Sequence, residues 1–245
     1  MKPHWQGVFP AVTTQLKRDQ SLDLDATARH LEALIASGVS GLVVCGSLGE
    51  NQALDRDEKR RVVACALEAA HGRVPVLSGV AEPSTSLAIR YVRDVEELGV
   101  DGVMLLPAMT YKGDPRETLA HFRTVAKSTG LPIMIYNNPI SYANDLTPAM
   151  FAELADQKNF VALKESSGDV RRITDLHNTV GDCRLERGHQ SRAHARRHQG
   201  RDGLRSGVSR VSNRGAVCGR VRRLRCRIWA ARRASPIALS QPVTL

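Results

Sequence analysis

Short apolar runs alternate with amphipathic stretches along the first part of the chain, and this rhythm limits the possible folds more than any other feature. Runs of this kind suit strands that are buried on both faces of a sheet. The expected strands are residues 7–13, 41–45, 74–80, 102–107, 131–139 and 160–164. Apolar residues at helical spacing predict helices at about residues 23–37, 55–71, 84–98, 115–128 and 147–155, and from about 169 onward. Strands that alternate with helices in this way form a parallel sheet.

The loops after the strands favour a closed barrel over an open sheet, although the rhythm itself fits both. An open nucleotide-binding sheet needs a glycine-rich turn after its first strand, and Thr13-Thr14-Gln15-Leu16 contains no glycine. Polar groups instead follow the ends of four different strands, as they do when a ring of strands surrounds one site. We therefore predict an α/β fold, a (β/α)8 TIM barrel of which this chain supplies about six βα units, so that the barrel is truncated.

Composition excludes several classes of protein. A hydrophobic content of 42% in 245 residues is ample for a core. No apolar run reaches the roughly 18 residues of a membrane-spanning helix, and the N-terminus lacks an apolar signal core, so we expect a cytoplasmic protein. The cysteines are odd in number and lack metal-binding or disulfide-like spacing, which indicates neither zinc nor a disulfide scaffold. They are Cys45, Cys65, Cys183, Cys218 and Cys226.

A lysine ends the last of the expected strands. An ammonium group at Lys164 is costly to bury unless its pKa falls or it finds a partner, and a lysine with a lowered pKa can act as a nucleophile. The common alternative is that such a side chain reaches water or pairs with a carboxylate, here that of Glu165. Near the end of the preceding strand lies Tyr136, whose phenol could donate and accept a proton beside the amine.

A tight turn, Gly46-Ser47-Leu48-Gly49-Glu50, follows the second expected strand. Its glycines permit positive φ angles and close approach of the backbone to a ligand. Exposed amides in such a turn can hold a carboxylate, and the Ser47 hydroxyl could add a further contact. Simple chain reversal is the alternative interpretation. The position of the turn in a βα loop favours a functional role.

Three motifs together resemble the dihydrodipicolinate synthase and N-acetylneuraminate lyase family. They are the turn at residues 46–50, Tyr136-Asn137-Asn138-Pro139, and Leu163-Lys164-Glu165-Ser166-Ser167-Gly168, and the resemblance covers about residues 5–182. Members of this DapA-like family are (β/α)8-barrel class I aldolases and related lyases. The resemblance implies that Lys164 attacks the ketone of a 2-oxo acid such as pyruvate to form a Schiff base. It also implies that Tyr136 shuttles the proton and that the Ser47 hydroxyl lies next to Tyr136 in the relay.

The same resemblance implies how a substrate is held. The amides of Ser47 and Leu48, in the turn that includes Gly49, would grip its carboxylate. Asn138 and Tyr111 would contact the variable end of the substrate or else be ordinary loop residues. Neither a metal nor an organic cofactor is implied. The relatives imply a homo-oligomer, a homotetramer, and neither nucleic acid nor a membrane is expected as a partner.

Three departures from the family pattern bear on the substrate. Dihydrodipicolinate synthases carry an arginine two residues beyond the proline of the tyrosine motif, to bind a second carboxylate, whereas Ile140 and Ser141 occupy this region. Met109 stands where the loop after the fourth strand supplies a tyrosine, and Leu48 replaces a threonine. Catabolism of a sugar-derived or hydroxyproline-derived 2-oxo acid therefore fits better than lysine biosynthesis. Aldolase, dehydratase and deaminase reactions all stay open.

The last part of the chain has a different character, so we divide it into a partial barrel at 1–182 and an Arg-rich tail at 183–245. The tail holds 16 Arg, no Lys and two acidic residues, a net charge of +14, against −4 for residues 1–182. A nucleic-acid-binding arm, a disordered tail and translation in a shifted reading frame are three interpretations, and we favour the third. The histidines of the tail, His189, His194 and His198, are then incidental.

Loss of the last two barrel strands has consequences for activity. It would leave open edges on the first and sixth strands and uncover the apolar interior. We expect the intact family member to be a Schiff-base lyase and leave open whether this chain is active or inactive. The alternative function is a non-catalytic barrel fragment whose Arg-rich tail binds nucleic acid.

Overall fold

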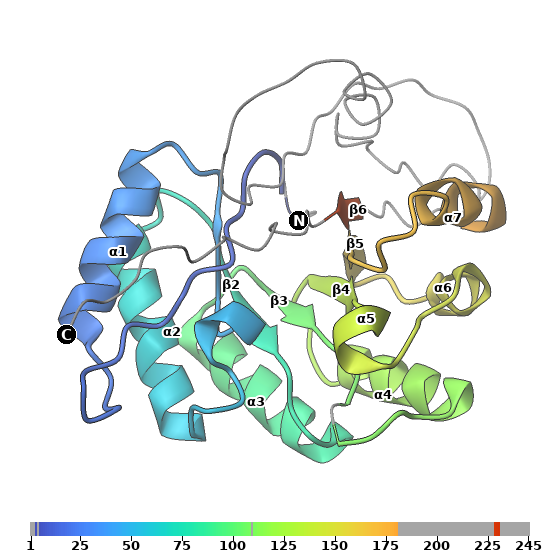
Figure 1. Cartoon of the computed structure of the whole chain (residues 1–245), viewed down its shortest axis with the longest axis horizontal. Helices are drawn as coiled ribbons and strands as arrows, with labels where there is room; N and C mark the ends of the chain where they lie inside the picture. Colours follow the sequence, from blue (N-terminus) through green and yellow to red (C-terminus); the bar gives the residue numbers. More distant parts are fainter. Residues whose placement is uncertain (1–2, 4, 109, 181–227, 231–245) are drawn as a thin grey trace, which may run out of the picture.

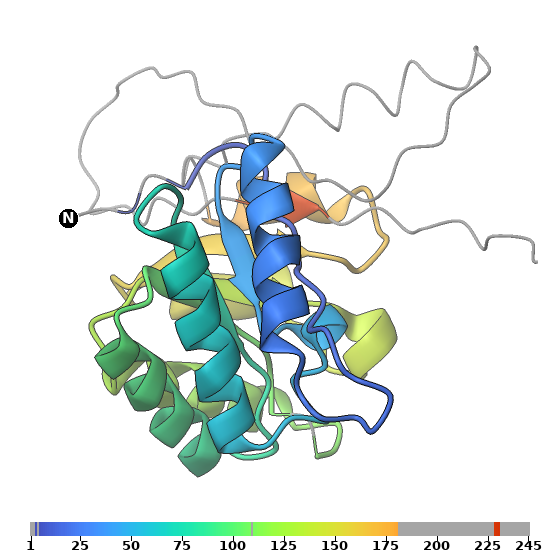
Figure 2. The ribbon, with the colours of Figure 1, turned by 90° about the vertical axis from the view of Figure 1, so that its left-hand side faces the viewer.

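A computed structural model describes residues 3, 5–108, 110–180 and 228–230. Their strands form one parallel sheet with the order β1-β2-β3-β4-β5-β6, so that neighbours in the sheet are also neighbours along the chain. The helices lie along the outer side of the curved sheet (Figure 1). Figure 2 shows α1, α2 and α3 side by side on one flank. This is the arrangement expected when each strand returns through a right-handed helical crossover.

All pairs of neighbouring strands are parallel, as the rhythm of the sequence predicted for β1 to β5, whereas no strand was predicted at β6. Every residue of the first four strands is buried, which agrees with their almost continuous apolar sequences. The strands are β1 (Leu42–Val44), β2 (Val76–Val80), β3 (Gly102–Leu105), β4 (Ile133–Asn137), β5 (Phe160–Glu165) and β6 (Ile228–Ala230).

The six expected helices are confirmed with small shifts at their ends. Asp55 and Asp114 begin two of them with reciprocal capping boxes, in which a glutamate three residues later binds the capping residue's amide. The sequence did not predict the short helices η1 (Ser47–Gly49) and α5 (Pro139–Tyr142). The others are α1 (Leu24–Ala36), α2 (Arg56–Ala70), α3 (Thr85–Leu98), α4 (Pro115–Lys127), α6 (Pro148–Leu154) and α7 (Arg172–Val180).

The expected strand at residues 7–13 is largely wrong. This segment makes one parallel bridge, Ala11 with Val43, in which the Val12 amide donates to Val43 O at 2.9 Å and the Val43 amide to Pro10 O at 3.0 Å. A proline has no amide hydrogen to extend the ladder, and Gly7 has a φ of 90° that is incompatible with an extended strand. The segment therefore lies beside β1 without forming a strand.

Two apolar clusters lie on the two faces of the sheet. Along β4, Ile133 and Ile135 belong to the cluster packed against the helices, whereas Met134 and Tyr136 belong to the other. The second cluster fills the side of the sheet that faces away from the helices. Its members are Trp5, Phe9, Val43, Leu77, Ala81, Met104, Leu106, Met134, Tyr136 and Ala162. The side-chain alternation of a strand thus directs Tyr136 into the interior.

The Arg-rich segment contributes β6 to the described structure. This strand lies parallel to β5, with Leu163 opposite Ile228 and Glu165 opposite Ala230. The tail histidines and Cys183, Cys218 and Cys226 lie outside the described residues. Within residues 3, 5–108, 110–180 and 228–230, no group of His, Cys, Asp and Glu side chains could hold a metal ion, and no helix could cross a membrane.

Candidate active site

Lys164 and Tyr136 are partners in the ladder between β5 and β4. Residues opposite each other in parallel strands direct their side chains to the same face of the sheet. The Lys164 Nζ accordingly lies 4.2 Å from the centroid of the Tyr136 ring. This is the geometry of a cation–π contact. The amine and the phenol that the sequence singled out are therefore brought together on the interior face.

The surroundings of Lys164 favour a neutral amine. Burial lowers the pKa of Lys164 from its ordinary value, while the nearby Tyr136 phenol acts in the opposite direction. Among the described residues, no carboxylate pairs with this lysine. Glu165, the partner in the alternative interpretation, is buried on the other face, where it accepts from Asn137 Nδ2 at 2.9 Å and from the Ser167 amide at 2.6 Å. The pairing of Lys164 with Glu165 is therefore wrong.

Asn138 holds the Tyr136 phenol in place. Its Nδ2 donates to Tyr136 Oη at 3.0 Å, and its Oδ1 accepts from the Ser141 amide at 3.2 Å as the N-cap of α5. Tyr136 itself is only 7% exposed. The sequence predicted Asn138 as a substrate contact. In the structure its amide group orients the phenol, and a contact with substrate stays a prediction.

The Ser47 hydroxyl, which the resemblance places next to Tyr136 in the relay, is hydrogen-bonded to the hydroxyl of Tyr142. Tyr142 is the last residue of α5, and its ring stands edge-on to that of Tyr136, with centroids 5.7 Å apart and planes at 85°. The sequence analysis missed Tyr142. The only local signal was an aromatic residue one helical turn beyond Asn138, and its partner Ser47 is 95 positions away in the chain.

The turn that carries Ser47 is held in an unusual backbone conformation. Cys45 has a φ of 50°, in the left-handed region that few non-glycine residues adopt. The Asn51 side chain, which is fully buried, donates to Cys45 O at 2.8 Å and to Gly79 O at 3.3 Å. Thr14 Oγ1 donates to Gly49 O at 2.8 Å. These contacts tie the turn to β2 and to the N-terminal segment.

Two amides of this turn point to no internal acceptor. The Gly49 amide donates to Gly46 O at 2.9 Å, whereas those of Ser47 and Leu48 donate to no group in the described part of the chain. Gly49 is buried and closes the turn, and the Ser47 and Leu48 side chains are exposed. Adjacent unpaired amides form a concavity that can bind an anion.

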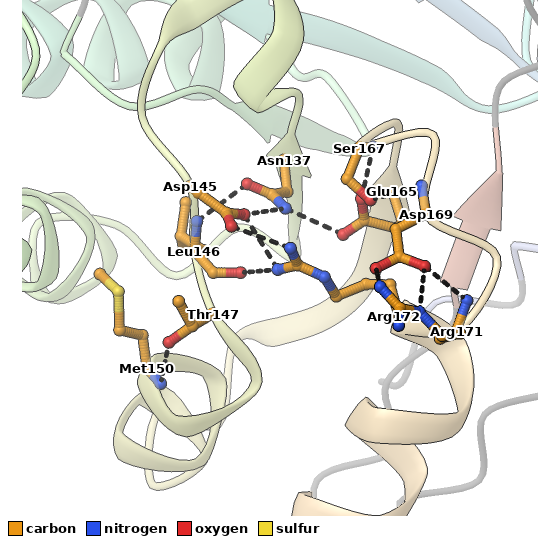
Figure 3. Close-up of polar contacts among 10 residues, drawn as sticks. All are labelled: Asn137, Asp145, Leu146, Thr147, Met150, Glu165, Ser167, Asp169, Arg171 and Arg172. Carbon is orange, nitrogen blue, oxygen red and sulfur yellow. Dashed lines mark hydrogen bonds and ion pairs between the residues drawn. The ribbon is translucent and has the colours of Figure 1, made fainter.

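A polar network fastens the ends of β4 and β5 from the opposite face (Figure 3). The Arg172 guanidinium contacts both carboxylate oxygens of Asp145, at 2.9 and 2.8 Å, and donates to Leu146 O at 3.0 Å. Asn137 Nδ2 bridges Asp145 at 3.1 Å and Glu165 at 2.9 Å. Since Asn137 and Glu165 directly follow the two interior residues of the site, the network determines where those residues lie.

The charge of Asp145 is maintained in this network. Burial by itself would raise the pKa of Asp145, but hydrogen bonds from Arg172 and Asn137 outweigh it, and the pKa lies below its usual value. Asp145 reciprocally raises the pKa of Arg172. The pair is thus ionised at neutral pH, and its bidentate geometry is the stronger form of an arginine–carboxylate contact.

The remaining predicted contacts are peripheral. Tyr111 is 65% exposed, and its carbonyl oxygen accepts from Asn144 Nδ2 at 3.3 Å. Ile140 and Ser141 are exposed in α5. Met109 lies outside the described residues. The described residues therefore present no basic side chain at the two positions after the proline of the tyrosine motif.

Comparison with known proteins identifies the family. Residues 4–214 match the dihydrodipicolinate synthetase family, which is most of the chain. The chain belongs to this family. The match to the dihydrodipicolinate synthetase family runs past residue 182, whereas pairwise alignments with family members cover about 180 residues.

Similar proteins within the dihydrodipicolinate synthetase family include enzymes from archaea and bacteria. The 4-hydroxy-tetrahydrodipicolinate synthase of Methanospirillum hungatei is 36% identical over 180 residues, which cover 73% of this chain and 62% of that protein. The dihydrodipicolinate synthase structure from Aquifex aeolicus superposes with a TM-score of 0.69 at 30% identity, covering 73% and 61%. YagE from Escherichia coli K12, solved in complex with pyruvate, gives a TM-score of 0.69 at 31% identity, covering 73% and 60%.

These matches confirm the predicted TIM-barrel class for the dihydrodipicolinate synthetase domain. The chain spans about 60% of the length of the curated relatives it matches.

Proposed function

We propose that this protein is a lyase or aldolase that acts on a 2-oxo acid such as pyruvate through a Schiff base on Lys164. One observation carries the proposal: the half-buried Lys164 amine, with a lowered pKa, lies over the ring of its ladder partner Tyr136. A neutral amine is the form that attacks a ketone, and a phenol beside it can transfer the proton. The YagE structure, which is 31% identical to this chain, contains pyruvate.

The reaction begins with addition of the Lys164 nitrogen to the ketone carbon. The π electrons of the carbonyl move to its oxygen, and one proton passes from nitrogen to that oxygen with the help of Tyr136. A second proton lets the oxygen leave as water, while the nitrogen lone pair forms the C=N bond. The resulting iminium withdraws electrons from the neighbouring carbon, which permits the bond to that carbon to form or break.

The substrate carboxylate would bind at the turn after β1. The unpaired amides of Ser47 and Leu48 suit an anion, and Gly49 closes the turn without a side chain. A Cβ at Gly49 would lie 2.9 Å from Val12 O, so only glycine allows this packing. The reactive ketone lies next to the carboxylate in a 2-oxo acid, which places it toward the amine.

The variable end of the substrate is proposed to lack a second carboxylate. Ile140 and Ser141, exposed in α5, provide no charge to bind one. This supports a catabolic reaction on a sugar-derived or hydroxyproline-derived 2-oxo acid, even though several relatives are named for 4-hydroxy-tetrahydrodipicolinate synthesis. Turnover of a panel of 2-oxo acids, compared with the reaction of those relatives, distinguishes the two. Faster synthase turnover would exclude the catabolic assignment.

A homo-oligomer, a tetramer, is proposed as the functional assembly. One similar structure, 30% identical, is described as the first monomeric variant of dihydrodipicolinate synthase, which indicates that other synthases associate. Sedimentation equilibrium of the full chain tests the assembly. A single species with the mass of one chain would contradict it.

Reductive trapping tests the Schiff base itself. The full chain is incubated with pyruvate and sodium borohydride, digested, and analysed by mass spectrometry. We expect the reduced pyruvate adduct on Lys164 and its loss in Lys164→Arg, while Lys158→Arg, an exposed lysine before β5, keeps the adduct. Wild-type protein that is folded but gives no adduct would show that this chain lacks the proposed activity.

The charge of the tail supports a second candidate function. Residues 183–245 carry a net charge of +14, and dense arginine favours contacts with phosphates. Under this alternative the barrel is a non-catalytic scaffold and the tail retains nucleic acid. Salt-sensitive DNA binding by the full chain, abolished by deletion of residues 183–245 and accompanied by no Lys164 adduct, would favour the alternative.

A further inference from the structure

We propose that Tyr142 is a proton-relay residue that connects Ser47 to the Tyr136–Lys164 pair within a single chain. The inference rests on the proposed Schiff-base function and assigns a role to a residue that the sequence motifs do not include. Tyr142 is the one described side chain that bonds the Ser47 hydroxyl and also contacts the Tyr136 ring. It therefore joins two groups of the site that do not bond each other directly.

The backbone places Tyr142 accurately. Helix α5 begins immediately after β4, and Asn138 caps it while also holding the Tyr136 hydroxyl. The Tyr142 amide donates to Asn138 O at 3.0 Å, and Asn144 Nδ2 donates to Tyr142 O at 3.3 Å. One asparagine thus orients both phenols. Rigid placement of this kind is what a relay needs, because proton transfer requires heavy atoms within hydrogen-bonding distance.

The hydroxyl pair is suited to passing a proton. Burial raises the pKa of Tyr142 to about 12, the Ser47 hydrogen bond acts in the opposite direction, and the Tyr136 phenol raises it further. Both hydroxyls are therefore neutral at physiological pH. A neutral hydroxyl donates one hydrogen bond and accepts others, so each can receive a proton on one side and release one on the other. Ser47 is exposed, so the chain of hydroxyls ends at water.

The relay has a defined place in the reaction. When the carbinolamine loses water, the Tyr136 proton goes to the departing oxygen, the C–O bond breaks, and the nitrogen lone pair forms the iminium. Tyr136 is left as a phenolate. Tyr142 then gives its proton to Tyr136 and takes one from Ser47, which takes one from water. Each oxygen loses and gains one proton, so water is the net donor and no oxidant or reductant is needed.

The same chain of hydroxyls, Tyr136, Tyr142 and Ser47, can also exchange a substrate proton with water. The iminium loses a proton from the carbon next to C=N, and its C–H electrons form the C=C bond of the enamine as the C=N electrons return to nitrogen. Tyr136 first passes its own proton through Tyr142 and Ser47 back to water, and the phenolate so formed accepts the substrate proton. In D2O the relay replaces it with a deuteron, which is delivered when the enamine reverts to the iminium. The rate at which the pyruvate methyl protons exchange for deuterium therefore reports on Tyr142.

Deuterium exchange and reductive trapping together test the inference. Exchange is followed by proton NMR on the full chain in D2O, and the final amount of Lys164 adduct is measured separately with borohydride. Tyr142→Phe keeps the ring against Tyr136 but removes the hydroxyl. We expect at least tenfold slower exchange with the final adduct unchanged. Tyr91→Phe, which removes a buried hydroxyl bonded to Ser78 on the helix-facing side, is the matched control and keeps wild-type exchange.

Coupling between the two hydroxyls separates a relay from a structural role. We expect Ser47→Ala to slow exchange, Ser47→Thr to restore it, and Ser47→Ala with Tyr142→Phe to be no slower than the slower single variant, because each change breaks the same chain. The relay would be overturned if exchange by Tyr142→Phe were less than tenfold slower than wild type, or if the effects of the two single changes multiplied in the double variant. Either result would leave the adduct and the proposed function intact. Absence of adduct in wild type would overturn both.

Discussion

Tyr136 and Lys164 face each other across the β4–β5 ladder, with the lysine Nζ 4.2 Å from the centre of the tyrosine ring. The next pair of the same ladder, Asn137 and Glu165, is hydrogen-bonded on the opposite face. Two successive register pairs thus have different roles: Tyr136 and Lys164 are the proposed reactive groups, and Asn137 and Glu165 hold the two strands together. A slip of one residue would exchange the faces and remove the site.

Removal of the Tyr136 hydroxyl should slow turnover and preserve binding. In Tyr136→Phe the ring still covers Lys164, but the proton donor is lost, and general acid–base catalysis contributes roughly 10²–10⁴-fold. We expect kcat to fall by that order while borohydride still traps pyruvate on Lys164 after long incubation. Steady-state kinetics measures the change in kcat, and the yield of the borohydride adduct measures whether Schiff-base formation is preserved. Unchanged kcat would remove Tyr136 from the mechanism.

The reactivity of the Lys164 amine should titrate at unusually low pH. Burial lowers its pKa, and an amine is neutral above its pKa, so more of it is nucleophilic at neutral pH than for an ordinary lysine of pKa about 10.4. Labelling with limiting dinitrofluorobenzene across a pH series, read by peptide mass spectrometry, gives the midpoint. Tyr136→Phe should move it lower still, because the phenol acts in the opposite direction. A midpoint at or above the ordinary value would contradict the assignment.

Loss of Arg172 should destabilise the strand ends. Its side chain is 13% exposed and bonds both oxygens of Asp145, so Arg172→Met leaves a partly buried carboxylate without its partner and should cost about 1–3 kcal/mol. The neighbouring Arg171, 81% exposed and paired with Asp169, is the matched control. Arg171→Met should leave the free energy of unfolding close to the wild-type value, because solvent screens an exposed ion pair. Equal urea midpoints for the two variants would refute a special role for Arg172.

A methyl group at Gly79 should disturb the turn that carries Ser47. A Cβ there would lie 2.3 Å from Cys45 O, a backbone atom that cannot move aside easily. We expect Gly79→Ala to cost about 1–3 kcal/mol and to reduce the yield of trapped pyruvate. In Gly130→Ala the nearest atom, Glu96 Oε1, is 3.7 Å away, and stability should change by at most about 0.5 kcal/mol. The melting temperature and the yield of trapped pyruvate are measured for both variants. Wild-type values of both quantities in Gly79→Ala would show that a side chain is tolerated at this position.

His121 should make the fold sensitive to acid. It is buried, bonded to Thr85 Oγ1 at 2.9 Å and Leu106 O at 3.1 Å, and burial lowers its pKa. A group with a lowered folded pKa contributes stability above its unfolded value of about 6.5 and loses it as pH falls through the folded value.

The matching experiment compares pH slopes of stability. His121→Gln should show a smaller loss of melting temperature than wild type as pH decreases below about 6.5. His71→Gln, at an exposed helix end, should follow wild type. Identical slopes in wild type and His121→Gln would exclude His121 as a source of acid sensitivity.

The sequence alone determined five of the parallel strands, the helices between them, and the two residues at the centre of the proposed site. Periodicity and capping depend on neighbouring residues, which is why Asp55 and Asp114 mark helix starts and why Tyr136 and Lys164 stand near strand ends. The N-terminal segment was predicted less well, because one proline and one glycine outweighed its apolar character.

Only the tertiary structure decided which groups meet. Tyr142 bonds Ser47 across 95 positions of the chain, and Glu165 turns away from Lys164 to join Asn137. Such contacts depend on strand register and on the packing of distant segments, and local sequence patterns predict neither of these. The proposed reactive residues could thus be predicted from the sequence, whereas the partners that orient them follow from the fold.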